Sequence, residues 1–212
     1  MAFRTLPDNI QYRLFDFNLQ RYISQSESGS GLINTVEYAD PRWTVDVEVD
    51  CFDDVGLSED LDLPTVNEIR MIWASVRGGL ESLLIRHPVY ICPRLNKDNP
   101  QVAQTVGRLA KIEKGNIVTV TGVNAALKLS SGDYITFQYN DRRALGQVIS
   151  AEFNPTGYRI EIEPRLPKYI SIGANVCFDR MELRMRALNN SFSINDGYPF
   201  RTAKFRFCES SI

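Results

Sequence analysis

TVNEIRMIWASVRGGLESLL, residues 65–84, is the stretch that decides the fold. Its apolar residues recur at steps of three and four, which places them on one stripe of an α-helix. The stripe consists of Val66, Ile69, Ile72, Trp73, Val76, Leu80 and Leu83. Thr65 and Glu68 have the spacing of a capping box, and Pro64 blocks an earlier start. We therefore expect one helix over residues 65–84, with this stripe packed on a sheet.

The composition is that of a globular protein, and it has no excess of basic residues that would bind a polyanion. The chain has 212 residues, with 24 Lys and Arg against 26 Asp and Glu and a net charge of -2. A chain of this length buries roughly 70% of the surface that its unfolded form exposes, so its core is stable without disulfide cross-links. The charge balance disfavours general nucleic-acid binding. The sequence has neither a signal-peptide pattern nor a run of about 18 apolar residues, so we expect cytoplasmic synthesis and no membrane insertion.

The four cysteines, Cys51, Cys92, Cys177 and Cys208, are scattered along the chain without a C-x-x-C pair. This spacing fits reduced, mostly buried thiols better than a zinc site or a disulfide framework. We expect neither a metal ion nor another cofactor.

The N-terminal part is expected to supply strands to the sheet. Residues 9–22 suggest a strand or a docked arm, and residues 24–31, SQSESGSG, suggest a flexible loop. A strand at residues 32–37 and a turn at residues 39–42 should follow. The clearest strand is WTVDVEVDC, residues 43–51, in which apolar and polar side chains alternate. One of its faces should be core and the other acidic.

The segment between Trp43 and Ile69 has nine acidic residues and no Lys or Arg, whereas the C-terminal part is rich in arginine. Three interpretations are open: a divalent-ion site, a solvated face, or a surface that docks another subunit. The docking hypothesis pairs the acidic patch of one copy with the basic patch of its neighbour. The candidate interface residues are Asp46, Glu48, Asp50, Arg180, Arg184 and Arg186.

Residues 85–93, IRHPVYICP, suggest a short strand between prolines, and they contain His87, the only histidine. A single histidine can act as a general base, but no nucleophile stands near it in the sequence. A His-Pro step is more simply the entry to a loop.

Short strands separated by turns fill residues 105–167, which we expect to form a small antiparallel β-barrel. The predicted strands are residues 108–112, 117–121, 134–139, 145–152 and 158–163. The aromatic residues Tyr134, Phe137, Tyr139 and Tyr158 are candidates for ligand stacking or, more commonly, for the core. Because strand patterns resume up to the C-terminus, we expect residues 1–104 and 168–212 to form one β domain that carries the barrel as an insertion.

The order of these features resembles the distal tail proteins of long-tailed bacteriophages. The resemblance rests on WTVDVEV, IRMIWASVRGGLESLL and LKLSSGDYITF, and it spans most of the chain from Trp43 to Pro167. It implies a β-sandwich or split-barrel ring domain with an inserted β-barrel. It also implies a structural, non-enzymatic virion protein whose hexameric ring joins the tail tube protein to the tail tip or hub protein of the baseplate.

Two other classes of function stay open. A carbohydrate-binding module would present exposed barrel aromatics to a cell-surface glycan. A glycoside hydrolase would need two carboxylates from residues 46–62 facing one cleft.

Overall fold

A computed structural model describes residues 4–6, 10–53, 63–195, 197 and 200–210. Within these residues the protein is mainly β with one α-helix, as the sequence predicts. The chain forms two compact units. The first comprises Met1–Asp8, Leu80–Arg186 and Ser210–Ile212, and the second comprises Asn9–Gly79 and Ala187–Glu209.

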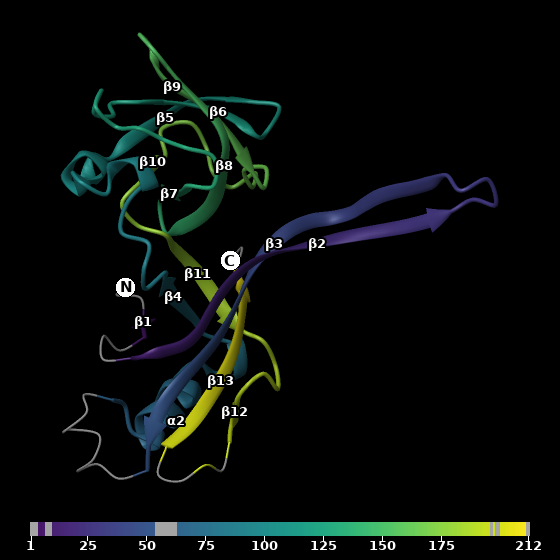
Figure 1. Cartoon of the computed structure of the whole chain (residues 1–212), viewed down its shortest axis with the longest axis vertical. Coiled ribbons are helices and arrows are strands. Elements are labelled where there is room, and N and C mark those ends of the chain that lie inside the picture. Colours follow the sequence, from purple (N-terminus) through teal and green to yellow (C-terminus); the bar gives the residue numbers. More distant parts are fainter. Residues whose placement is uncertain (1–3, 7–9, 54–62, 196, 198–199, 211–212) are drawn as a thin grey trace. The chain divides into compact units, whose positions relative to one another are not determined.

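The second unit is built on an antiparallel sheet whose strands neighbour one another in the order β12–β13–β3–β2. Strands β2 (Tyr12–Glu27) and β3 (Ile33–Phe52) form one long hairpin (Figure 1). Strands β12 (Ser193–Ile194) and β13 (Phe200–Glu209) complete this part of the sheet. The predicted alternation of β3 is confirmed, because every second side chain is buried over its C-terminal half. The buried residues are Trp43, Val45, Val47, Val49 and Cys51.

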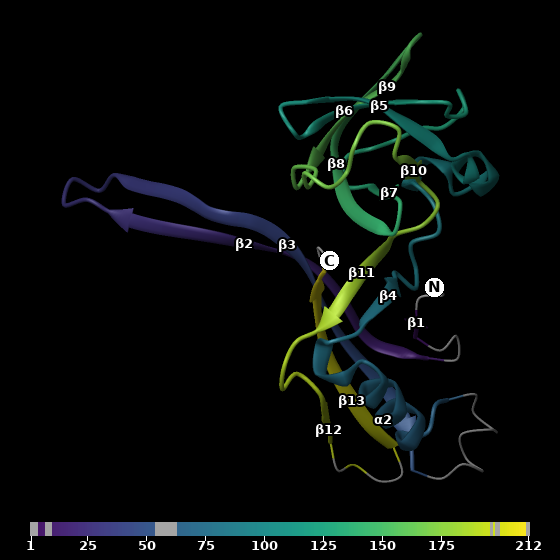
Figure 2. The same cartoon turned by 180° about the vertical axis from the view of Figure 1, so that it is seen from behind.

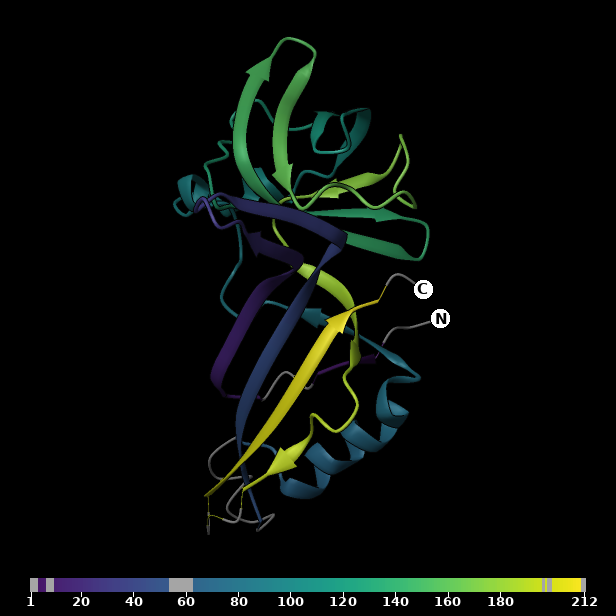
Figure 3. The same ribbon diagram turned by 90° about the vertical axis from the view of Figure 1, so that its right-hand side faces the viewer.

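Helix α2 (Val66–Ser75) lies along the sheet of the second unit (Figure 3). The predicted capping box is confirmed: the Thr65 N–H donates to Glu68 Oε2 at 2.8 Å, and the Glu68 N–H donates to Thr65 Oγ1 at 3.2 Å. The predicted stripe is buried at Val66, Ile69, Ile72 and Val76. Trp73 is only half-buried, and its ring stacks on Phe192 with centroids 5.0 Å apart.

The helix is shorter than the expected range of residues 65–84. Arg77, Gly78 and Gly79 in η1 (Arg77–Gly79) have φ angles of 51°, 63° and 96°, so three successive left-handed residues end the α-helix. Gly79 is also sterically required, since a Cβ there would lie 2.3 Å from the carbonyl oxygen of Ala187. Leu80 was predicted to be core, and this is wrong: it is 66% exposed. Leu83 is buried, but in the following strand.

Of two predicted breaks in the N-terminal strands, the loop at residues 24–31 is present only from Ser28 onward, and the turn at residues 39–42 is wrong. Residues 24–27 belong to β2, and the reversal occurs at Ser28–Leu32, where the Gly31 N–H donates to the Ser28 carbonyl at 2.8 Å. Residues 39–42 belong to β3. Pro41 is accommodated because the register between β2 and β3 shifts at this point, with Gln20 opposite Arg42 and Tyr22 opposite Ala39. A bulge of this kind tolerates the missing N–H of proline.

The first unit contains a closed six-stranded barrel (Figure 2). Its strand order is β10–β5–β6–β9–β8–β7. The strands are β5 (Gly107–Glu113), β6 (Ile117–Thr121), β7 (Tyr134–Tyr139), β8 (Arg142–Asn154), β9 (Gly157–Glu163) and β10 (Asn175–Cys177). All five predicted strands are present. The closing strand β10 comes from beyond the expected insertion at residues 105–167.

A strip of three further strands, outside the barrel, belongs to the same unit. Strand β4 (Ser82–Arg86) pairs in parallel with β1 (Arg4–Thr5) and antiparallel with β11 (Glu182–Ala187). The predicted strand at residues 85–93 is therefore wrong after Arg86. Pro88 and Pro93 interrupt this stretch, and the short 3-10 helices η2 (Arg94–Asn96) and η3 (Pro100–Gln104) follow it.

Candidate functional site

The predicted acidic face of β3 is paired with β13 inside the same unit. The Arg206 guanidinium binds Asp46 through two contacts, Nε to Oδ1 at 2.5 Å and a terminal nitrogen to Oδ2 at 2.8 Å. The hydrogen bond to Asp46 raises the pKa of Arg206. Lys204 forms an ion pair with Glu48, and Thr202 Oγ1 donates to Asp50 Oδ1 at 3.2 Å. Basic residues of the chain itself thus partly neutralise this face.

The predicted basic residues lie in the other unit. Arg180 is exposed, with its Nε 3.5 Å from Asp179 Oδ2. Arg184 Nε donates to Ser82 Oγ at 2.6 Å, and Arg186 Nε donates to Ser210 Oγ at 3.0 Å. Arg184 therefore links β11 to β4, and Arg186 links β11 to Ser210. It stays a prediction that the acidic residues of one copy dock on these basic residues of another.

The outer part of the β2–β3 hairpin, residues 21–40, projects away from the rest of its sheet (Figures 1 and 2), and we call it the arm. Nearly all of its side chains are exposed, including large apolar ones. Tyr38 is 68% exposed, Val36 62% and Ile33 66%. An isolated two-stranded hairpin is marginally stable in water, and clustered exposed apolar groups mark interaction sites.

The two faces of the arm differ in charge. Ser24 pairs with Val36, and the rings of Tyr22 and Tyr38 lie 6.1 Å apart, which places these four residues on one face without any charge. The opposite face carries the ion pair between Arg21 and Glu37, whose charged atoms are 3.2 Å apart. The charged face also carries Ile23 and Ile33, which stand opposite Glu37 and Glu27. The faces therefore differ in charge, and the uncharged one is better suited to burial.

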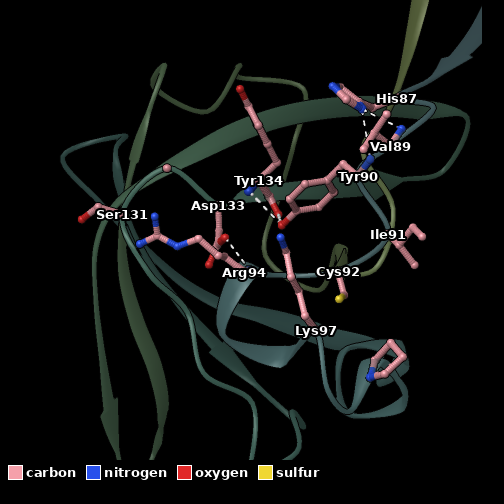
Figure 4. Close-up of a pocket in the computed structure, with 12 residues that line it drawn as sticks. His87, Val89, Tyr90, Ile91, Cys92, Arg94, Lys97, Ser131, Asp133 and Tyr134 are labelled. Carbon is pink, nitrogen blue, oxygen red and sulfur yellow. Dashed lines mark hydrogen bonds between the residues drawn. The ribbon is translucent and has the colours of Figure 1, made fainter.

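A pocket of about 520 Å³ lies in the first unit, between the segment after β4 and the turn before β7 (Figure 4). We call it the Tyr90 pocket. The rings of Tyr90 and Tyr134 meet edge to face with centroids 5.5 Å apart. The Tyr90 hydroxyl donates to the Tyr134 carbonyl at 3.2 Å and accepts from the Tyr134 N–H at 3.1 Å. Burial raises the pKa of Tyr90, so its hydroxyl stays protonated and acts here as a structural group.

His87 stands at the edge of this pocket and holds a turn. Its Nδ1 accepts from the backbone N–H groups of Val89 at 3.1 Å and Tyr90 at 3.0 Å (Figure 4). Burial lowers the pKa of His87, which favours the neutral ring with its proton on Nε2. The interpretation of His87 as a loop-entry residue is thus supported by its contacts.

The polar groups of the pocket divide into satisfied acceptors and projecting cations. The Asp133 carboxylate is 3% exposed and accepts from the Arg94 N–H at 3.0 Å, the Ser130 N–H at 2.7 Å and Ser130 Oγ at 3.0 Å. The side chains of Arg94 and Lys97 are exposed and line the opening. Neither has an ion-pair partner among the residues that the structure describes. The pocket therefore offers apolar walls and positive charge.

The barrel aromatics are mainly structural. Phe137 is fully buried, and Tyr158 is buried with its hydroxyl bonded to the Leu127 carbonyl. Tyr139 is half-buried against the barrel core, and Tyr134 belongs to the Tyr90 pocket. The core interpretation is confirmed for Phe137 and Tyr158, so the four residues form no shared stacking platform.

One buried charge in the first unit connects the barrel with the strip beside it. Glu182 on β11 is 3% exposed. It accepts from Arg86 Nε on β4 at 2.9 Å, and it is ion-paired with Arg143 on β8. A buried carboxylate needs such partners, so this triad fixes the position of β11 beside β8.

The remaining chemistry of the described residues is sparse. The four cysteines are free thiols. Burial, aided by Asp53 and Asp50, raises the pKa of Cys51 to about 11. No group of three His, Cys, Asp or Glu suited to a metal ion occurs in the described ranges. Asp54, Glu59, Asp60 and Asp62, part of the carboxylate set considered for hydrolysis, lie outside them. None of the described helices is long and apolar enough to cross a membrane.

No protein-family model and no curated protein matches the chain. The phage-tail resemblance thus rests on the sequence patterns. The structural features that bear on function are the arm and the Tyr90 pocket.

Sequence reasoning missed both features. The Ser/Gly-rich composition of residues 24–31 indicated a loop and concealed the strand pairing of the arm. The available signal was the pairing of apolar residues on both sides of that segment, Ile23 before it and Ile33 and Val36 after it. For the Tyr90 pocket, the proline-bounded apolar run at residues 88–93 was the only indication.

Proposed function

We propose that this chain is a structural subunit that closes into a ring of six copies at the distal end of a phage tail. In this role the ring joins the tail tube to the tail tip or baseplate. The sequence resemblance motivates the proposal. The single observation that best supports it is the exposed arm of residues 21–40, which presents an uncharged face with Tyr38 and Val36.

The sheet of the second unit provides a second element suited to assembly. Strand β2 lies at the end of its strand order, so in the described part of the chain its outer backbone edge has no strand neighbour. Exposed strand edges pair readily with another chain unless they are covered. An edge next to an arm gives one subunit two different surfaces for its neighbours.

The geometry of a ring explains why such an arm is useful. A head-to-tail contact joins two different patches and closes into a ring when the rotation between subunits permits it. The arm of one copy would cover a different surface on the next copy, and every arm would be buried in the closed ring. A stable contact of this kind buries about 1,000 Å² or more, which an extended hairpin can supply.

Negative-stain electron microscopy of the purified protein tests the proposal. We expect closed rings with a central channel. A protein that stays monomeric at all concentrations, and also in the presence of tail tube and tail tip proteins, would contradict a ring-forming role.

A further inference from the structure

We propose that the Tyr90 pocket binds a polypeptide segment in which an aromatic side chain stands next to an acidic residue. The pocket and its rim lie within the first unit, so this inference does not depend on ring assembly. It adds a partner-binding site on the barrel-containing unit.

The shape and walls of the pocket fit one large apolar side chain. Its volume of about 520 Å³ lies within the range of specific ligand sites. The paired rings of Tyr90 and Tyr134 form its wall (Figure 4). The exposed residues Val89, Ile91 and Pro100 line it at the rim. Edge-to-face and offset contacts with these rings favour an aromatic guest.

The charges select an acidic neighbour for that side chain. Arg94 and Lys97 project at the opening. Among the described residues that line the pocket they face one carboxylate, Asp133, which is held in a buried position by three hydrogen bonds. The Tyr90 hydroxyl is likewise engaged with Tyr134. A neutral sugar would find few free acceptors here, whereas a carboxylate would meet two cations and a bidentate Arg94 contact.

The rim indicates a polypeptide as the occupant. Val89 is 78% exposed, Ile91 68% and Leu95, on the same turn as Arg94, 55%. These side chains extend the apolar surface beyond the cavity. A small acid would fill the cavity and leave the rim in water, while a peptide would bury an anchor residue and cover the rim around it.

Selection from a library of random displayed peptides on the full chain tests the inference. We expect the enriched peptides to share an aromatic residue beside Asp or Glu. In fluorescence anisotropy, a labelled peptide containing Phe-Asp should bind more tightly than the same peptide with Phe-Asn. Enriched peptides that lack acidic residues would overturn the inference.

Variants locate the binding. The double variant Arg94→Gln with Lys97→Gln should lose about tenfold in affinity for the Phe-Asp peptide and lose the preference over Phe-Asn. Arg108→Gln removes an exposed charge from β5 outside the pocket and should bind like wild type. Ile91→Ser should weaken both peptides and keep the preference. All four side chains are exposed, and matching thermal midpoints would show that the fold is intact.

Two outcomes would contradict the assignment. Unchanged binding by the Arg94/Lys97 double variant would show that these cations do not form the site. Phenylacetate that binds as tightly as the Phe-Asp peptide would assign the pocket to a small acid and remove the polypeptide partner.

Discussion

Asp46 on β3 and Arg206 on β13 stand directly opposite each other and form a two-pronged ion pair. The acidic strand face that suggested an intersubunit surface is thus stabilised first within the chain. Because both side chains are partly exposed, the pair itself contributes little, about 0 to 1 kcal/mol.

A charge reversal at this pair should lower the stability of the folded subunit itself. Asp46→Arg places two arginines opposite each other and should lower the free energy of unfolding by about 1 kcal/mol. The double variant Asp46→Arg with Arg206→Asp should recover most of the loss. Urea unfolding of the two variants measures this difference, and equal losses in both would show that the pairing contributes nothing.

The early end of helix α2 predicts unequal effects along its apolar stripe. Ile69 is fully buried, so Ile69→Ala should lower the free energy of unfolding by about 3 kcal/mol. Leu80 is exposed beyond the left-handed turn, and Leu80→Ala should change it by less than about 0.5 kcal/mol. Thermal or urea unfolding distinguishes them; a large loss at Leu80 would mean that the helix continues.

Glu182 should be required for the stability of the first unit. Glu182→Gln removes the negative charge between Arg86 and Arg143, and the Arg143 side chain is only 16% exposed. We expect a loss of about 3 kcal/mol, since a nearly buried guanidinium would lose its counter-charge. The exposed Glu152→Gln variant on β8 is the control and should stay close to wild type. Equal unfolding midpoints for the two variants would refute the role of the triad.

His87 predicts a specific pH dependence. Its pKa is lowered in the folded state, so below about pH 6.5 the unfolded chain binds a proton that the folded chain does not. Stability should therefore fall as the pH drops below that value and level off below the folded pKa. His87→Asn keeps an acceptor for the turn and should lack this component. Unfolding curves for both proteins between about pH 5 and pH 7 test the difference.

The strongly periodic parts of the chain could be predicted from sequence. The capping box at Thr65, the alternation of residues 43–51 and the five barrel strands follow from local patterns, and all are present. The end of the helix could not be predicted from the apolar period, because that period runs on to Leu83. The backbone takes left-handed φ angles at Arg77–Gly79 and ends the helix there. Leu83 fits the helical spacing of the apolar residues, but it is buried as part of strand β4.

The candidate sites depended on contacts that sequence spacing does not contain. Arg206 and Asp46 are 160 residues apart, so only the strand register shows that they pair. The Tyr90 pocket likewise requires the Tyr134 turn, 44 residues further along the chain. The arm was not predicted because serine and glycine are typical of loops. In the structure, Ser24 and Ser26 are strand residues, because the pairing of β2 with β3 continues through them.

The mass of the purified protein by light scattering, compared between two neighbouring arm substitutions, tests the central claim most directly. Val36→Asp places a charge on the uncharged face of the arm, and Thr35→Asp places the same charge on the opposite, already charged face. We predict that wild type and Thr35→Asp assemble into rings of equal mass, while Val36→Asp stays a folded monomer. Rings of wild-type mass from Val36→Asp would contradict assembly through the arm.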